Sequence, residues 1–308
     1  MMSYLLKRLA GAIPTLFIIV TLTFFLVRLA PGGPFDQARR LPPDISAHLE
    51  HAYGLDQPLL IQYARYLRAL AHADFGPSFR YRDFTVTELI AQGLPVTLEL
   101  GTCALLLALV VGIPAGVFAA VRHDEPADRL TMLLAVLGIT IPSFVLLPAL
   151  ALLFGLELRW LPVAGWEPGS VRVLVLPVVA LALPPLAYIA RLTRGSMLEV
   201  LRSPYLRTAV AKGLPRHRIL MRHALRPALI PVAGFLAPAV ASIMTGSLVV
   251  ESLAGMPGVG RYLVQGALNR DYTLVMGMVL LYSTVLILTG LLVDLLYTWL
   301  DPRIRLAR

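Results

Sequence analysis

Six long apolar segments dominate this sequence and limit what it can fold into. They run over residues 9–27, 95–121, 130–155, 173–190, 229–250 and 273–296. A helix of about 20 apolar residues crosses the hydrocarbon core of a bilayer and satisfies its own backbone hydrogen bonds there. The chain is 57% hydrophobic and 15% charged, whereas soluble domains average about 45–50% apolar and about 25% charged residues. The pattern predicts an all-α polytopic membrane protein with six transmembrane helices.

The first apolar segment raises the question of a cleaved signal peptide. Lys7 and Arg8 precede it, as basic residues precede the core of a signal peptide. However, such a core is about 7–15 residues long, and residues 9–27 exceed that length. We therefore expect a first transmembrane helix that the mature protein keeps.

Residues 31–94 are too polar to span a membrane, and we expect an external helical subdomain there within a single transmembrane domain over residues 1–308. A short helix is predicted from Asp44 to Tyr53, closed by Gly54. A longer amphipathic helix is predicted from Pro58 to about Ala73, and Thr85 with Glu88 fits a capping box that opens a third helix. The apolar face expected for the longer helix comprises Leu60, Tyr63, Leu67 and Leu70.

The basic residues predict the orientation of the spans. Short loops rich in Lys and Arg stay in the cytoplasm. With six spans and both termini inside, the cytoplasmic side holds Lys7, Arg8, Arg122, Arg129, the basic residues between Arg191 and Arg226, and Arg303, Arg305 and Arg308. The short outer loops hold only Arg159, Arg172, Arg261 and Arg270. We therefore expect a multi-pass protein with both termini in the cytoplasm.

The net charge of +9 does not indicate a nucleic-acid-binding protein. The charges lie at the ends of apolar spans and form no basic stripe with interleaved aromatic residues. We expect the lipid bilayer, and no nucleic acid, as a partner. The single cysteine, Cys103, excludes an intramolecular disulfide and a multi-cysteine metal site.

The most unusual polar segment is the cytoplasmic loop over residues 191–228. Its part from Tyr205 to Pro231 contains six Lys or Arg residues and no carboxylate. Tyr205, Leu206, Ala209 and Val210 recur at helical spacing, which predicts a short amphipathic helix. Gly213 suits the left-handed position that ends such a helix.

This segment resembles the cytoplasmic EAA loop of permease subunits in ABC importers. Arg207, Thr208 and Ala209 occupy the places of Glu-Ala-Ala, and Gly213 occupies the place of the glycine. The acidic residue is absent here, and Pro227 falls one residue later than in the sugar-permease version of the motif. The sequence pattern R-T-A-x-A-K-G-L-P, followed by R-H-A-L-x-P-A-L-x-P, is similar to that of the peptide branch of the family, the oligopeptide and dipeptide permease B subunits.

Further matches extend this resemblance over nearly the whole chain. They are Arg191-Leu-Thr-Arg-Gly-Ser-Met-Leu-Glu-Val-Leu201, Arg28-Leu-Ala-Pro-Gly-Gly-Pro-Phe35, Asp74-Phe-Gly-Pro-Ser78 and Gly266-Ala-Leu-Asn-Arg-Asp-Tyr272. The resemblance implies a type I ABC importer permease in a bacterial inner membrane. It implies four kinds of partner: a homologous second permease, two cytoplasmic ABC ATPases, an extracytoplasmic peptide-binding protein and the peptide substrate.

By the same resemblance, this chain would form half of the translocation path and pass motion from the ATPases to it. The residues expected to couple to an ATPase are Tyr205, Arg207, Thr208, Ala209, Lys212, Gly213, Leu214 and Arg216. No cofactor is expected on this chain, since ATP and Mg²⁺ would bind to the ATPases. The substrate stays open, because relatives of this type handle dipeptides, longer peptides, glutathione, nickel chelates and peptide antibiotics.

The chain has no nucleotide-binding loop of its own. A P-loop needs Gly directly before its Lys, but Lys7 follows Leu6 and Lys212 follows Ala211, and the chain contains no other lysine. The sequence also lacks the H-E-x-x-H and G-x-S-x-G motifs of intramembrane enzymes. We expect no catalytic residue and no metal site.

An ion-coupled secondary transporter is the remaining alternative. Such proteins usually carry ionisable residues near the midplane and inverted repeats. Here Glu99, Glu251 and Asp294 are expected near span ends, and no repeat is visible. Neighbouring genes for two ATPases and a binding protein would favour the ABC importer.

Several prolines interrupt the spans, and one is our candidate for a mechanical kink. Pro142, followed by Ser143, falls within the third span, which we expect to break at Pro142 and Pro148. Pro is also tolerated in spans where neighbours satisfy the backbone. A polar translocation path or simple helix packing would equally explain three residues of the fifth span, Ser242, Thr245 and Ser247.

Overall fold

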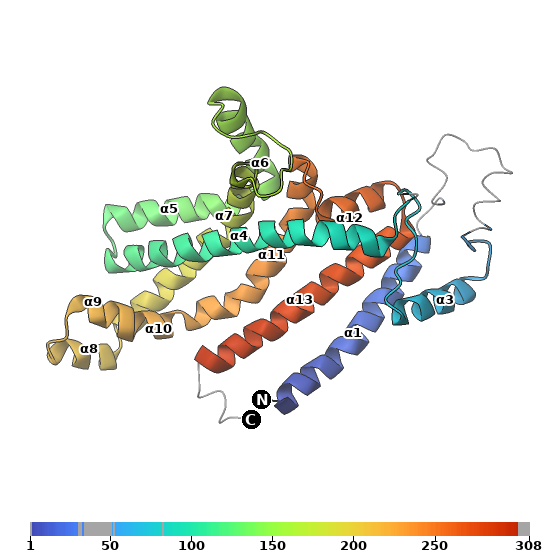
Figure 1. The fold of residues 1–308 in the computed structure, drawn as a ribbon. Helices are drawn as coiled ribbons and strands as arrows, with labels where there is room; N and C mark the ends of the chain where they lie inside the picture. Colours follow the sequence, from blue (N-terminus) through green and yellow to red (C-terminus); the bar gives the residue numbers. More distant parts are fainter. Residues whose placement is uncertain (1, 30–32, 34–50, 52, 82, 301–308) are drawn as a thin grey trace. The chain divides into compact units, whose positions relative to one another are not determined.

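The computed structural model describes residues 2–29, 33, 51, 53–81 and 83–300 (Figure 1). Within this part of the chain, five helices are long and apolar enough to cross a membrane, and a sixth crossing follows if a bent helix pair is counted as one span. The all-helical, polytopic fold is confirmed. The predicted helix over residues 44–53 and the basic tail over residues 301–308 lie almost wholly outside the described residues.

Contacts divide the chain into two compact units. The first unit comprises Met1–Thr97 and Pro257–Ile287. Its described residues form α1 (Met2–Leu29), α3 (Leu59–Ala71) and α12 (Val259–Leu268), together with the start of α4 (Val86–Val121) and of α13 (Tyr272–Leu300). The external segment thus shares a unit with parts of the membrane-spanning helices.

Two apolar clusters form the core of the first unit. In one, Phe24 of α1 packs with Tyr66 of α3 and with Met276 of α13. In the other, Val86 and Leu89 of α4 pack with Leu274 of α13. These contacts hold together the end of α1 and the starts of α4 and α13 within the unit.

Two expectations for the external segment meet different outcomes. The capping box is confirmed: the backbone N–H of Thr85 donates to Glu88 Oε2 at 2.8 Å, and the N–H of Glu88 donates to Thr85 Oγ1 at 3.2 Å. The apolar face of α3 was partly wrong. Tyr63, Leu67 and Leu70 pack on the core, but Leu60 is 73% exposed, because the buried side of the first turn belongs to Gln62.

The second span begins earlier than its sequence indicates. We expected a separate helix to end before Pro95, whereas α4 continues through Pro95 to Val121 as one helix of 36 residues. A proline inside a membrane helix removes one N–H, and its neighbours satisfy the freed carbonyl. The boundary between the units falls within this helix, at Thr97.

The second unit comprises Leu98–Met256 and Leu288–Arg308. Its helices are α5 (Pro126–Thr140), α6 (Ser143–Leu150), η1 (Ala151–Glu157), α7 (Val171–Leu201), α8 (Pro204–Ala211), α9 (Arg216–Arg218), η2 (Ile219–Ala224), α10 (Leu225–Ala228) and α11 (Ile230–Ala254). Helix α7 is at the centre of this unit and packs against α5, α6 and α11.

The predicted start of the cytoplasmic loop at residue 191 was wrong, because α7 continues past it. The fourth span was expected to end at Ala190, but α7 continues to Leu201 and includes the motif that starts at Arg191. No helix-breaking residue other than Gly195 stands in this stretch, so the helix passes from the apolar into the polar segment. The loop over residues 191–228 is therefore helical in its first third.

Two glycines bring α4 and α7 into close contact. A Cβ added at Gly112 would lie 2.7 Å from the carbonyl oxygen of Leu186, and one at Gly116 would lie 2.5 Å from that of Ala190. Glycines four residues apart let membrane helices approach closely. This contact anchors the C-terminal part of α4 to the helix that leads into the segment over residues 202–228.

Candidate functional site

The candidate coupling segment begins with helix α8, which is amphipathic as predicted. Ser203 precedes it, and Pro204 takes the first helical position, where a missing N–H costs nothing. Leu206 and Ala209 face inward and are buried with Met197 of α7 and Ile219 of η2. Through this cluster, α8 rests on the C-terminal end of α7.

Helix α8 ends in a Schellman motif. The N–H of Gly213 donates to the carbonyl of Val210 at 2.9 Å, and the N–H of Leu214 donates to that of Ala209 at 3.4 Å. Gly213 has a φ of +72°, so the predicted left-handed position is confirmed. Leu214 packs on the buried cluster beside Ala209, which is the apolar contact that accompanies this motif.

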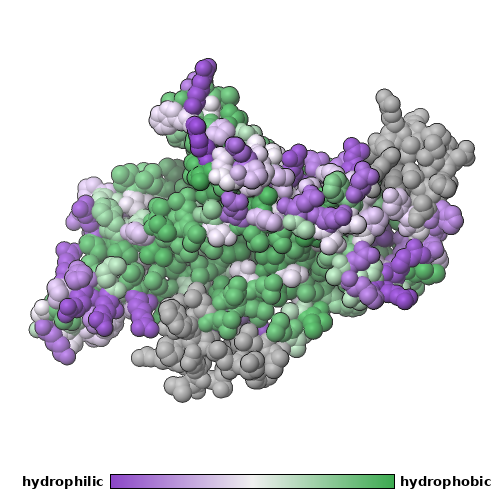
Figure 2. Space-filling view, viewed as in Figure 1, coloured by the Kyte–Doolittle hydropathy of each residue, from purple (hydrophilic) through white to green (hydrophobic). Residues whose placement is uncertain are grey.

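The outer face of α8 and the turn after it are exposed and polar. Figure 2 shows hydrophilic residues gathered over α8 and α9. The exposed residues among those we assigned to coupling are Tyr205, Arg207, Thr208, Lys212, Gly213 and Arg216. Val210, expected on the buried side, is 61% exposed and adds an apolar contact to this cationic surface.

Two of the assigned residues face the protein itself. Ala209 is only 8% exposed, and Leu214 is partly buried in the same cluster. Both therefore hold α8 in place. The residues on the outer face are the ones available for contact with a partner. Helical spacing alone could not distinguish the two sides, because each carries apolar residues.

Tyr205 connects α8 to the helix that follows the turn. Its hydroxyl donates to the backbone carbonyl of His223 at 2.7 Å across 18 residues of sequence. Burial raises the pKa of Tyr205, so the hydroxyl remains a donor at neutral pH. Together with the apolar cluster, this bond makes α8, the turn and η2 one supported hairpin.

A buried ion pair joins the start of α5 to the last third of α7. Arg194 donates to both carboxylate oxygens of Asp128, with Nε–Oδ1 2.6 Å and Nη2–Oδ2 2.7 Å. Asp128 is 2% exposed and also accepts the N–H of Asp124 at 3.0 Å. Sequence analysis placed both residues in cytoplasmic segments but did not pair them, because 66 residues separate them.

The same cluster is a poor metal site. His123, Asp124 and Asp128 present ligand atoms within 4.8 Å of one another. However, the guanidinium of Arg194 already occupies both oxygens of Asp128 and lies 3.2 Å from His123 Nδ1. A fixed positive charge at this position opposes a cation, so the cluster is structural.

The third span breaks at Pro142, as predicted. Helix α5 ends at Thr140, and α6 begins at Ser143 with an angle of 105° between the two helical segments. Pro142 is extended, with ψ 143°, which ends α5 and starts α6. Pro148 was also expected to break the span, but it lies inside α6, in a turn where the helix tolerates it.

Helix α11 passes against this break. A Cβ added at Gly246 would lie 3.4 Å from Ser143 Oγ and 2.9 Å from Leu181 Cδ2 of α7. Side chains of α6 and α7 thus pack directly on α11 beside the bend.

The three polar residues assigned to α11 do not share one environment. Ser242 and Thr245 are exposed and lie one turn apart, with Thr245 Oγ1 bonded to the carbonyl of Ala241. Ser247 is buried and donates to the carbonyl of Met244 at 2.8 Å. That Ser242 and Thr245 line the translocation path stays a prediction. The buried position of Ser247 suits packing between helices.

Two motifs that are far apart in the sequence meet in the first unit. Ser78 donates its hydroxyl to Asp271, which also accepts the N–H of Arg80 at 3.1 Å and that of Leu274 at 3.1 Å. Thr273 donates to the carbonyl of Pro77 at 2.6 Å. Asp271 therefore caps α13 and fixes the Asp74–Ser78 loop beside it.

Two family profiles match this chain along most of its length. Residues 1–101 match the N-terminal region of the membrane component of binding-protein-dependent transport systems. Residues 112–306 match the inner membrane component of binding-protein-dependent transport systems. The chain belongs to this family of permeases.

Relatives of this permease match end to end. The chain is 50% identical over 305 residues to the oligopeptide transport system permease protein OppB of Salmonella typhimurium, with 99% of this chain and 100% of the relative covered. It is 45% identical over 308 residues to the dipeptide transport system permease protein DppB of Bacillus subtilis, with 100% of this chain and 99% of the relative covered.

A solved structure shares the permease fold. A chain from inward-facing conformations of the MetNI methionine ABC transporter superposes with a TM-score of 0.57 at 18% identity. The match covers 70% of this chain and 97% of that chain. At this identity, the match supports the fold alone.

Membership in the family settles four general points. The protein is a multi-pass inner-membrane component, it is a non-catalytic subunit, and it works with an ATPase and with a binding protein. The absence of a P-loop agrees with this division of labour, because the energy comes from another polypeptide. The outer face of α8 is then the natural candidate for the ATPase contact.

Proposed function

We propose that this chain is the permease subunit of an ATP-driven importer of oligopeptides. The observation that carries the proposal is the 50% identity to the Salmonella OppB permease over 99% of this chain. In this role the chain forms half of a translocation path with a second, homologous permease. Two cytoplasmic ATPases bind ATP and Mg²⁺, and an extracytoplasmic protein delivers the peptide.

Coupling in this proposal occurs at the outer face of α8. Arg207, Thr208 and Lys212 project from one short helix, with the basic turn at Arg216 behind it. Such a surface fits a groove with carboxylates at its rim, because guanidinium and ammonium groups form charge-assisted bonds there. When ATP binding closes the ATPase dimer, motion of α8 passes through the buried cluster to α7.

In this proposal, the peptide passes along the bend at Pro142 and the exposed side of α11. Movement of α7 reaches α6 and α11 through the close contact at Gly246. Ser242 and Thr245 offer hydroxyl groups to a passing peptide, which has no fixed side-chain chemistry. We propose that the second permease faces them across the path.

The substrate length is tested with the complete transporter in vesicles. We expect uptake of a labelled pentapeptide that depends on ATP and on the binding protein, and a weaker uptake of dipeptides. Uptake of dipeptides alone would contradict the oligopeptide assignment and favour the dipeptide relatives, to which identity is 45%. If stimulated ATP hydrolysis is intact but neither pentapeptide nor dipeptide is taken up, the result would contradict both the oligopeptide and the dipeptide assignment.

A further inference from the structure

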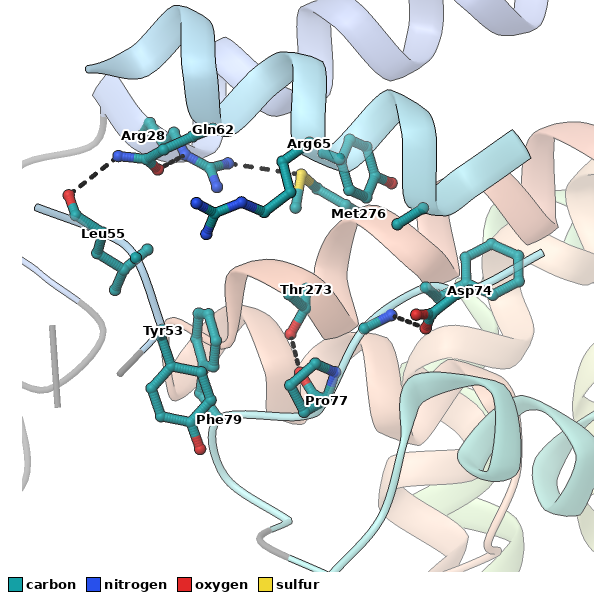
Figure 3. Close-up of a pocket in the computed structure, with 15 residues that line it drawn as sticks. Arg28, Tyr53, Leu55, Gln62, Arg65, Asp74, Pro77, Phe79, Thr273 and Met276 are labelled. Carbon is teal, nitrogen blue, oxygen red and sulfur yellow. Dashed lines mark hydrogen bonds between the residues drawn. The ribbon is translucent and has the colours of Figure 1, made fainter. Parts of the chain in front are cut away.

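A cavity of about 370 Å³ lies in the first unit, between the end of α1, helix α3 and the start of α13 (Figure 3). Arg28 of α1 and Arg65 of α3 both line it, together with Gln62, Tyr66 and Thr273. Asp74 is the only acidic residue among the described residues that line it, and its Oδ1 accepts the N–H of Gly76 at 2.8 Å. The cavity therefore carries an excess of positive charge.

The guanidinium of Arg28 is fixed in place by neutral side chains. Its Nε donates to Gln62 Oε1 at 3.0 Å, its Nη1 contacts the sulfur of Met276 at 3.7 Å, and its Cζ lies 3.6 Å from the centre of the Phe24 ring. Gln62 is oriented for this by donating to the carbonyls of Leu55 and Gln57. Within the described part of the chain no carboxylate pairs with Arg28, whereas buried cations usually have one.

Tyr66 contributes a second donor to the cavity. Tyr66 is 9% exposed, and among the described residues its hydroxyl has no hydrogen-bond partner. Burial raises the pKa of Tyr66 to about 12, against the opposing effect of Arg28, so the hydroxyl keeps its proton. Arg65 adds a further cation from the same helix, with one nitrogen bonded to Gln57 Oε1. These donors point to a missing oxyanion.

The cavity lies at the depth of lipid head groups. The span Arg8–Leu29 has 22 residues, which is about 33 Å of helix and matches the hydrocarbon thickness of about 30 Å. Arg28 stands at the end of this span, and Thr273 stands at the start of the span Tyr272–Leu295. Two spans thus place the same cavity at one membrane surface.

An apolar hollow adjoins the cavity on the side of the membrane interior. It has a volume of about 410 Å³ and is lined by Leu16 and Phe17 of α1, Leu67 of α3 and Leu280 of α13. Phe75 lines both the hollow and the charged cavity. A polar, cationic site at the interface is complementary to the head group of an anionic phospholipid. The apolar hollow beside it is complementary to the first acyl carbons of that lipid.

We propose that this cavity binds the phosphate of an anionic phospholipid, with Arg28, Arg65 and the Tyr66 hydroxyl as donors and an acyl chain along α1 and α13. The bound lipid would neutralise Arg28 and fill the space between α1, α3 and α13. The proposal concerns the first unit alone and does not depend on which peptide is transported.

The test uses the complete transporter, purified in detergent and stripped of lipid. Dioleoyl phosphatidylglycerol is added, and bound lipid is counted by native mass spectrometry. We expect Arg28→Gln to bind it about tenfold more weakly, because a charge-assisted pair is lost. Tyr66→Phe should bind about fivefold more weakly, because one hydrogen bond is lost, and Arg28→Lys should retain part of the affinity.

Arg68→Gln is the matched control, because Arg68 is an exposed arginine of α3 that does not line the cavity. It should bind lipid as the wild type does. Tyr66→Phe keeps the test decisive if Arg28→Gln fails to assemble, since removal of an unpartnered hydroxyl should not unfold the protein. Equal lipid binding by the wild type and Tyr66→Phe would overturn the proposal. Displacement of the lipid by trialanine, but not by its C-terminal amide, would overturn it in favour of a peptide carboxylate.

Discussion

At the scale of single residues, Gly213 connects backbone geometry to coupling. Its φ of +72° is costly for residues with a Cβ, by about 1–2 kcal/mol, and least so for Asn. A Cβ added there would meet no atom within 4 Å, so packing opposes no substitution. The conformation of the backbone alone decides which residues are tolerated.

We therefore expect Gly213→Asn to retain function and Gly213→Val to lose it. Valine should cost about 1–3 kcal/mol of local strain, which would reshape the end of α8 while the chain stays in the membrane with its partner permease. The measurement is peptide-stimulated ATP hydrolysis and uptake by the reconstituted transporter. Gly195→Val is the matched control, because Gly195 lies in α7 with open space around it and no positive φ. Wild-type coupling in Gly213→Val would contradict the assignment of α8.

At the scale of elements, the contact between α4 and α7 is set by Gly116. A Cβ there would lie 2.5 Å from the carbonyl oxygen of Ala190 and 2.6 Å from Thr193 Cβ. Neither atom is at the end of a flexible side chain, so α4 and α7 would have to separate. The buried ion pair between Asp128 and Arg194 holds the same end of α7 to α5.

Gly116→Ala should destabilise the second unit by about 1–3 kcal/mol, the usual cost of overpacking. Gly101→Ala, on the same helix, should be neutral, because its Cβ would lie at an ordinary 3.6 Å from Ile243 Cγ2. Thermal unfolding followed by circular dichroism in detergent compares the two variants. Equal melting temperatures would show that α4 and α7 separate freely, contrary to the close contact.

At the scale of the whole molecule, the distribution of arginines predicts the orientation. We expect Ala64 of α3 outside, and Glu125 and Arg216 inside; Ala64, Glu125 and Arg216 are all exposed. Single cysteines at these sites in a Cys103→Ala background are treated with an impermeant maleimide in intact cells. Only Ala64→Cys should react, and all three should react after permeabilisation. Labelling of Arg216→Cys, but not of Ala64→Cys, in intact cells would reverse the topology.

Local sequence determined much of this fold, because the relevant forces act over a few residues. Apolar length identified the spans, since the bilayer imposes a fixed thickness. The Thr85–Glu88 box and the left-handed Gly213 were predictable, because each depends on bonds within one helical turn. Pro142 could be placed at a break for the same reason.

The tertiary structure decided what depends on neighbours that are distant in the sequence. Helical spacing grouped Ala209 with Val210, but only packing on Met197 and Ile219 shows that Ala209 faces inward. Pro95 lies inside α4, although a proline locally suggests a helix boundary. The Asp128–Arg194 pair and the charged cavity at Arg28 bring together residues from separate helices. No local sequence pattern predicts these contacts, because the free energy that favours them is gained only when the helices pack.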